Sequence, residues 1–144
     1  EFTSEDFAKY HPGGSLGKRL YLKVGDLAAQ NEKPQISSEA SVKDVIIEIT
    51  KNRLGAVAVV DDGKLTGIIT DGDIRRMLEK NDSIVNLRAK HIMCTSPKFI
   101  DKDELAVNAL DVLRKNNISQ ILVGTKTSFE GFIHLHDLLK EGII

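Results

Sequence analysis

The sequence contains a single cysteine, Cys94, and no tryptophan among its 144 residues. One cysteine cannot form a disulfide within the chain or supply the several thiolates of a zinc site, and we expect Cys94 to be a small, half-buried apolar residue. An excess of positive charge is also missing, because 20 Lys and Arg residues face 21 Asp and Glu residues. Without a positive field to attract polyanions, we expect neither nucleic acid nor membrane as a partner.

Long apolar segments are absent as well. No run approaches the ~20 apolar residues of a membrane-spanning helix, and no segment has the pattern of a secretory signal peptide. We therefore expect a cytoplasmic protein. What the sequence does contain is an ordinary hydrophobic fraction of 41%, which is typical of a globular protein with a packed core.

The sequence consists of two similar copies offset by 64 residues. The stretch "LGAVAVVDDGKLTGIITDGD", which begins at Leu54, aligns without a gap with "ISQILVGTKTSFEGFIHLHD", which begins at Ile118. Residues shared by the two copies include the pairs Ile36 and Ile100, Gly67 and Gly131, and Asp73 and Asp137. Such self-similarity at a fixed offset identifies a tandem repeat.

Each copy predicts the same order of elements: strand, helix, strand, strand, helix. Apolar residues recur at helical spacing after Ser41 and after Asp103, and both stretches end at "KN". Strands are predicted at residue 36 and residues 56–60 and 65–70, and in the second copy at 99–100, 120–123 and 129–135. Closing helices are predicted over 73–80 and 137–141.

These elements predict an α/β (α+β) fold of two small units. A unit of roughly 60 residues is marginally stable alone, so we expect the two copies to pack against each other around a pseudo-two-fold axis. Two related clefts would then form, each containing one junction between a strand and its closing helix.

The two junctions, "GIITDGD" and "GFIHLHD", resemble the motif of a pair of CBS domains, the Bateman module. The resemblance extends from about residue 23 to residue 144 and implies clefts that bind nucleotides such as AMP, ATP or S-adenosylmethionine. In that family the Thr and Asp of the motif hold the ribose hydroxyls, a role that falls here on Thr70, Asp73 and Asp137. His134 stands at the Thr position of the second copy.

Other residues follow from the same resemblance. Arg76, in the first turn of the closing helix, is a candidate phosphate contact, and Ile36 and Ile100 are further candidate residues of the ligand site. Since His134 can donate a hydrogen bond to a phosphate or stack on a base, we expect it to line the second cleft. His134, His136 and Asp137 have side chains that bind metals, but the neighbouring sequence supplies no further ligand and we predict no metal.

Thr70 and Asp73 also have the spacing of a helix capping box, in which both side chains bind N–H groups at the helix start. A cap alone favours Ser, Thr, Asp or Asn at the position of His134. Because the acid recurs in the second copy and the cap residue does not, the sequence favours ligand binding over capping.

The stretch "FAKYHPGGSLGKRLYLKVGDL", residues 7–27, resembles the boundary between the sugar isomerase (SIS) domain and the CBS pair of bacterial D-arabinose 5-phosphate isomerases. Those enzymes interconvert ribulose 5-phosphate and arabinose 5-phosphate for synthesis of the lipopolysaccharide or capsule sugar Kdo. The resemblance implies a linker remnant at 1–22, CBS domains at 23–86 and 87–144, and a missing SIS domain as partner. His11 would act in the active site of the parent enzyme, and we expect no catalysis by this chain alone.

The resemblance implies a regulatory ligand, either an adenine nucleotide (AMP or ATP) or a cytidine nucleotide such as CMP-Kdo, and no required cofactor. It also implies a homodimer within a tetrameric parent enzyme. The alternative is a structural dimerisation module with vestigial clefts, whose interface would use apolar residues of the closing helices: Ile74, Met77, Leu78, Leu138 and Leu139.

Overall fold

The computed structural model describes residue 17 and residues 20–143, and within them it contains two three-stranded sheets. The first comprises β1 (Gln35–Ile36), β2 (Ala56–Asp61) and β3 (Lys64–Thr70), and the second β4 (Phe99–Ile100), β5 (Gln120–Thr125) and β6 (Ser128–His134). In each sheet the first strand pairs parallel and the third antiparallel with the central strand. The predicted fold class and strand order are confirmed.

Four helices occur where the repeat predicted them: α4 (Val42–Thr50), α5 (Asp71–Lys80), α7 (Ala106–Lys115) and α8 (Leu135–Lys140). Helix α4 begins after Ser41, whose hydroxyl accepts a bond from the Asp44 N–H. Helix α7 begins later than the prediction at Asp103 and has no side-chain cap. Its first N–H, that of Ala106, instead donates to the Leu22 carbonyl at 2.8 Å. Within the described residues, no helix has the length and apolar composition needed to cross a membrane.

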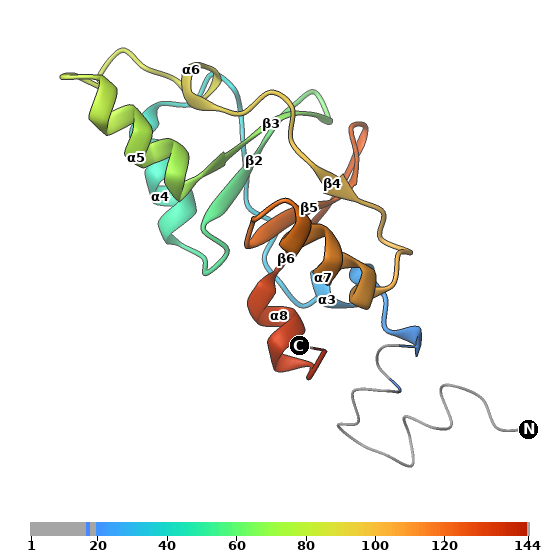
Figure 1. Ribbon diagram of the computed structural model, residues 1–144. Coiled ribbons are helices and arrows are strands. Elements are labelled where there is room, and N and C mark those ends of the chain that lie inside the picture. The colour runs from blue at the N-terminus through green and yellow to red at the C-terminus, as the bar shows by residue number, and fades with distance from the viewer. Residues whose placement is uncertain (1–16, 18–19, 144) are drawn as a thin grey trace, which may run out of the picture.

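Two short helices that the sequence analysis did not predict exchange places between the repeats. Helix α3 (Val24–Ala28) precedes the first sheet but packs on β5, β6 and α7, and α6 (Ala89–Ile92) precedes the second sheet but packs on β3 and α5 (Figure 1). Backbone bonds hold both crossings, from Gly25 N–H to Lys102 O and from Ala89 N–H to Ala40 O. We call each sheet, with the helices packed on it, a lobe; the first lobe contains β1–β3 and the second β4–β6. Each lobe therefore contains residues of both repeats.

The two sheets share a core. It is formed by buried side chains of β2, β3, β5 and β6 and the loop before β2: Leu54, Ala56, Ala58, Leu65, Leu122, Phe129 and Phe132. A backbone bond of 2.7 Å from Leu65 N–H to Lys126 O lies at the same interface. Because this core contains residues of both repeats, it places the loop before β2, in the first repeat, near β6 and its junction with α8, in the second.

The glycine of each motif gives room for the exchanged helix. A Cβ on Gly67 would lie 2.7 Å from the carbonyl oxygen of Cys94, which follows α6 and forms a backbone bridge with Ile68. Gly131 has a φ of +141°, a conformation that favours glycine, and faces Ala28 of α3. The Cys94 side chain is exposed, so the expectation of a half-buried residue is wrong; its backbone pairing at the border of the sheet explains the difference.

Candidate ligand-binding site

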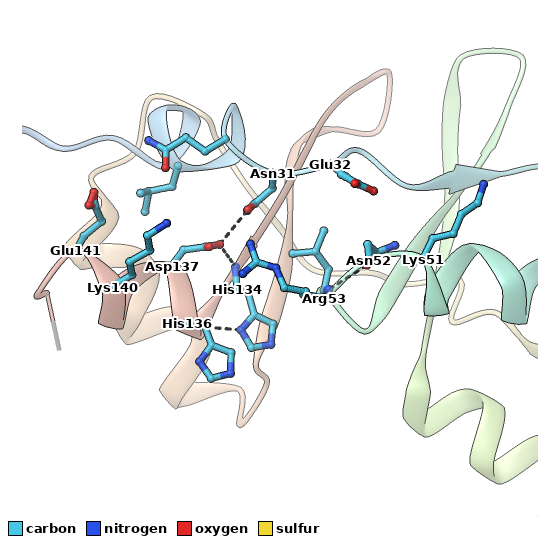
Figure 2. Close-up of a pocket in the computed structure, with 13 residues that line it drawn as sticks. Asn31, Glu32, Lys51, Asn52, Arg53, His134, His136, Asp137, Lys140 and Glu141 are labelled. Atoms are coloured by element: carbon cyan, nitrogen blue, oxygen red, sulfur yellow. Dashed lines mark hydrogen bonds between the residues drawn. The ribbon is translucent and has the colours of Figure 1, made fainter.

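A cavity of about 450 Å³ lies beside the junction of β6 and α8. Three segments meet there: the end of α3 and the residues after it, the loop after α4, and the start and end of α8 (Figure 2). The polar and charged lining residues are Gln30, Asn31, Glu32, Lys51, Asn52, Arg53, His134, His136, Asp137, Lys140 and Glu141. Two of the predicted site residues, His134 and Asp137, are thus brought together at a cavity.

The carboxylate of Asp137 is held through one of its two oxygens. Its Oδ2 accepts bonds from the backbone N–H of His134 at 2.7 Å and from Nδ2 of Asn31 at 2.9 Å. Within the part of the chain that the structure describes, Oδ1 has no hydrogen-bond donor or cation. An ionised carboxylate oxygen accepts hydrogen bonds only, so this oxygen can bind the hydroxyls of a ligand.

His134 caps α8, contrary to the argument from sequence. Its Nδ1 accepts a bond from the backbone N–H of His136 at 3.0 Å, and Asp137 accepts from the His134 N–H. The capping arrangement is therefore present in both repeats, because an unprotonated imidazole nitrogen accepts a hydrogen bond as a hydroxyl does, and the argument that a cap favours Ser, Thr, Asp or Asn at this position loses its force. The recurrence of the aspartate alone does not distinguish a ligand site from a cap.

The surroundings of the His134 ring favour its neutral form. Burial lowers the pKa of His134, and the charges of His136 and Arg53 lower it further, while that of Asp137 opposes them. Its ring stacks on His136 with centroids 4.7 Å apart. Since Nδ1 accepts a hydrogen bond, we assign the ring proton to Nε2, where it serves as a donor.

Positive charge at the cavity comes from both repeats. Arg53 extends from the loop after α4 toward His134, and Lys140 lies on α8 beside Asp137 (Figure 2). Neither forms an ion pair with any other described residue, whereas Lys51 lies 3.6 Å from Glu48. Guanidinium and ammonium groups without an acidic partner can bind a phosphate.

The first repeat arranges the same motif differently. Asp73 Oδ2 accepts bonds from Thr70 N–H at 2.9 Å and from the Thr70 hydroxyl at 3.2 Å. Its Oδ1 is occupied by Arg76 at 2.6 Å. Thr70, Asp73 and Arg76 thus contact one another, but they do not line the 450 Å³ cavity. Arg76 therefore occupies Oδ1 of Asp73, whereas the equivalent oxygen of Asp137 has no partner among the described residues.

The other predicted site residues lie elsewhere. Ile100 is 8% exposed in the core of the second lobe, and Ile36 packs against the core of the first; neither lines the cavity. His11 lies outside the described residues, as does most of the segment 1–22. Across residues 20–143, no three His, Cys, Asp or Glu side chains gather as metal ligands would.

Sequence reasoning missed Asn31 and Arg53. Both come from the first repeat yet line the cavity of the second, and the residues at the corresponding positions, 64 further on, are Thr95 and Asn117. A search for residues shared by the repeats therefore passes over them. The available signal was the reverse, a difference between the copies: an amide at Asn31 where the second copy has Thr95, and a positive charge at Arg53 where it has Asn117.

Comparison with known proteins identifies the repeat. Residues 24–80 and 89–143 match the family model described as CBS domain. The chain is 36% identical over 145 aligned positions to the arabinose 5-phosphate isomerase KdsD of Yersinia pestis, covering 99% of this chain and 44% of that protein. It spans less than half the length of such curated relatives.

Solved structures show the same fold. The CBS domain pair of protein MJ0100, in complex with 5'-methylthioadenosine and S-adenosyl-L-methionine, superposes with a TM-score of 0.72 at 24% identity, covering 83% of this chain and 94% of that chain. The CBS domain protein PAE2072 from Pyrobaculum aerophilum, complexed with AMP, gives a TM-score of 0.71 at 20% identity, covering 81% of this chain and 90% of that chain.

Proposed function

This chain belongs to the CBS domain family, and from that premise we propose that it is a regulatory module that binds a nucleotide in the cavity at Asp137. The observation that carries the proposal is the state of the Asp137 carboxylate. One oxygen accepts from two N–H donors, the other has no partner among the described residues, and Asp137 lines a cavity to which both repeats contribute. A carboxylate in this state can accept hydrogen bonds from both hydroxyls of a ribose.

The remaining lining groups match the rest of a nucleotide. Arg53 and Lys140 would bind the phosphate, and the Nε2–H of His134 would donate to the phosphate or the ribose. The cavity volume of about 450 Å³ is within the range of small-molecule sites. The adenosine ligands of MJ0100 and PAE2072 support an adenine nucleotide.

We further propose that Thr70, Asp73 and Arg76 form a second, weaker site. A ligand there must displace the guanidinium of Arg76 from Asp73 Oδ1 before its own hydroxyl can bind. At the Asp137 cavity no such contact has to break. Ligand should therefore fill the cavity of the second repeat first.

The similarity to KdsD supports a role within an arabinose 5-phosphate isomerase. We propose that residues 1–22 follow a SIS domain, that 23–86 and 87–144 are the two CBS domains, and that His11 belongs to the active site of the parent enzyme. The regulatory ligand would be an adenine nucleotide or a cytidine nucleotide such as CMP-Kdo. The chain itself would have no isomerase activity.

A thermal-shift screen tests the proposal. The chain is melted alone and with AMP, ATP, S-adenosyl-L-methionine, CMP and CMP-Kdo, with inorganic phosphate as a control. A ligand at 100 times its dissociation constant adds about 2.7 kcal/mol of stability, which a melting curve resolves. A shift with one or more nucleotides and none with phosphate supports the proposal, and no shift with any of them contradicts it.

A second candidate function is structural dimerisation through the closing helices. Leu78 of α5 and Leu139 of α8 are 55% and 56% exposed, whereas Met77 and Leu138 are buried within the monomer. Only part of the predicted apolar face is therefore available to a partner. Sedimentation of the wild type and of a Leu78→Lys, Leu139→Lys double variant tests this function, which predicts a dimer that the substitutions convert to a monomer.

A further inference from the structure

Asn31 connects the two repeats at the ligand cavity. It follows α3 in the first repeat, and its Nδ2 donates to the Phe132 carbonyl at 3.0 Å and to Asp137 Oδ2 at 2.9 Å, both in the second repeat. A side-chain amide nitrogen carries two hydrogens, so these bonds use both of them. The two bonds fix the amide relative to β6 and to the first turn of α8 (Figure 2).

This arrangement determines which oxygen of Asp137 meets a ligand. Two N–H donors, from Asn31 and from the His134 backbone, converge on Oδ2 and hold the carboxylate in one orientation. We propose that Asn31 is a positioning residue that keeps Oδ1 of Asp137 directed at the cavity. That the cavity binds a nucleotide rests on the proposed function. That Asn31 positions Asp137 rests on the hydrogen bonds of Asn31.

The first repeat provides an internal comparison. Thr95 stands 64 residues after Asn31, and no hydrogen bond joins it to Asp73 in the described chain. Asp73 is held instead by Thr70 and by Arg76 of its own helix, and Arg76 covers the oxygen that is open in Asp137. Asn31, from the other repeat, contacts only Oδ2 of Asp137 and leaves Oδ1 available. Arg76, from the same helix as Asp73, occupies Oδ1 of Asp73.

Calorimetric titration with AMP tests the role in the variants Asn31→Ala and Asn31→Asp, with Thr95→Ala as the matched control. Without this donor the Asp137 carboxylate is no longer held in the orientation that meets the ligand, so for Asn31→Ala we expect AMP binding to be weaker by about tenfold, the effect of one hydrogen bond to a charged group. Thr95→Ala should bind as the wild type does. A fall in melting temperature without a change in AMP affinity for Asn31→Ala would overturn the inference.

Asn31→Asp adds a readout that a purely structural role would not give. At about pH 8 the introduced carboxylate repels Asp137, so binding should be weaker than in Asn31→Ala. As the pH falls, the pair takes up one shared proton, which restores a donor to Oδ2, and the affinity should recover. The charged and titratable groups that line the same cavity are unchanged in every variant, so the ratio to the wild type at each pH isolates the effect; they are Glu32, Lys51, Arg53, His134, His136, Lys140 and Glu141. A ratio independent of pH would contradict the role.

A measurement without ligand separates this inference from the proposed function. In the NMR spectrum of the free protein, the side-chain amide resonances of Asn31 should move in Asp137→Ala and stay in place in Asp73→Ala. If they do not respond to Asp137→Ala, the contact is absent in solution and the inference fails. If the wild type binds none of the nucleotides, the proposed function fails, and the amide resonances alone decide the inference.

Discussion

Asp73 and Asp137 occupy the same position of the two repeats, yet their carboxylates have different partners. Oδ1 of Asp73 accepts a bond from Arg76 at 2.6 Å. Asp137 accepts from Asn31 through Oδ2, and its Oδ1 has no partner among the described residues. The first repeat has the threonine of the family motif, Thr70, yet it is the repeat in which both carboxylate oxygens have partners. The partners of a motif carboxylate thus depend on its neighbours more than on the motif itself.

The motif glycine of the first repeat gives a prediction at this scale. In Gly67→Ala the new Cβ would lie 2.7 Å from Cys94 O and 2.8 Å from Met93 Sδ. One contact is to backbone, so the segment after α6 must move, and overpacking of this kind costs about 1–3 kcal/mol. Urea denaturation should show this loss, whereas Gly63→Ala, in a turn with open space, should lose only what its positive φ costs.

His134 predicts a pH dependence of stability. Its pKa in the folded protein lies below the usual 6.5, chiefly through burial, so the unfolded chain binds the proton more readily. The free energy of unfolding is therefore not reduced by this group above about pH 6.5, and it decreases as the pH falls from there toward the folded-state pKa. Protonation of Nδ1 also removes the cap of α8.

The matched variant is His134→Asn, because asparagine caps a helix without titrating. Unfolding free energies measured at about pH 7.5 and about pH 5.5 should fall more for the wild type than for the variant. An equal decrease in the two proteins would refute this role of His134.

At the scale of elements, the exchange of α3 and α6 defines the architecture. Each short helix precedes one sheet and packs on the other, and its backbone is bonded to the segment before the long helix of that other repeat. The residues between α3 and β1, Asn31 among them, are thereby placed beside β6. The ligand cavity exists because of this crossing.

The sequence predicted the repeated elements and not the crossing. Apolar residues at helical spacing identified α4 and α7, short apolar runs identified β2, β3, β5 and β6, and the repeat of the whole unit after 64 residues supported the shorter elements β1, β4 and α8. Helices of five and four residues, such as α3 and α6, are too short for a period. Contacts between distant segments, such as Asn31 with Asp137, have no local signal at all, so the site was predicted only as far as the motif reaches.

Val24 tests the crossing directly. It is fully buried in the core of the second lobe although it belongs to the first repeat. Val24→Ala removes two buried methyl groups and should cost about 2 kcal/mol. Hydrogen exchange should show faster opening of β5 and β6 than of β2 and β3. Faster opening confined to β2 and β3 would contradict the exchanged packing.

At the scale of the whole molecule, the two repeats share a core and a cavity. The core between the sheets takes Leu54, Ala56, Ala58 and Leu65 from one repeat and Leu122, Phe129 and Phe132 from the other. The cavity likewise draws Asn31 and Arg53 from the first repeat and His134 and Asp137 from the second. Binding a ligand there would stabilise the contact between the repeats.

The most direct measurement is calorimetric titration of the wild type, Asp137→Ala and Asp73→Ala with AMP. Both aspartates accept a bond from the N–H of their helix cap residue, so both variants lose a cap and each is the structural control for the other. At about 1.5–3 kcal/mol for each hydrogen bond to a charged group, Asp137→Ala should weaken binding by tenfold or more. Asp73→Ala should leave the stronger site within about twofold of the wild type, since the Asp137 cavity is intact. Retained affinity in Asp137→Ala with loss in Asp73→Ala would contradict the assignment of the nucleotide site to the second repeat.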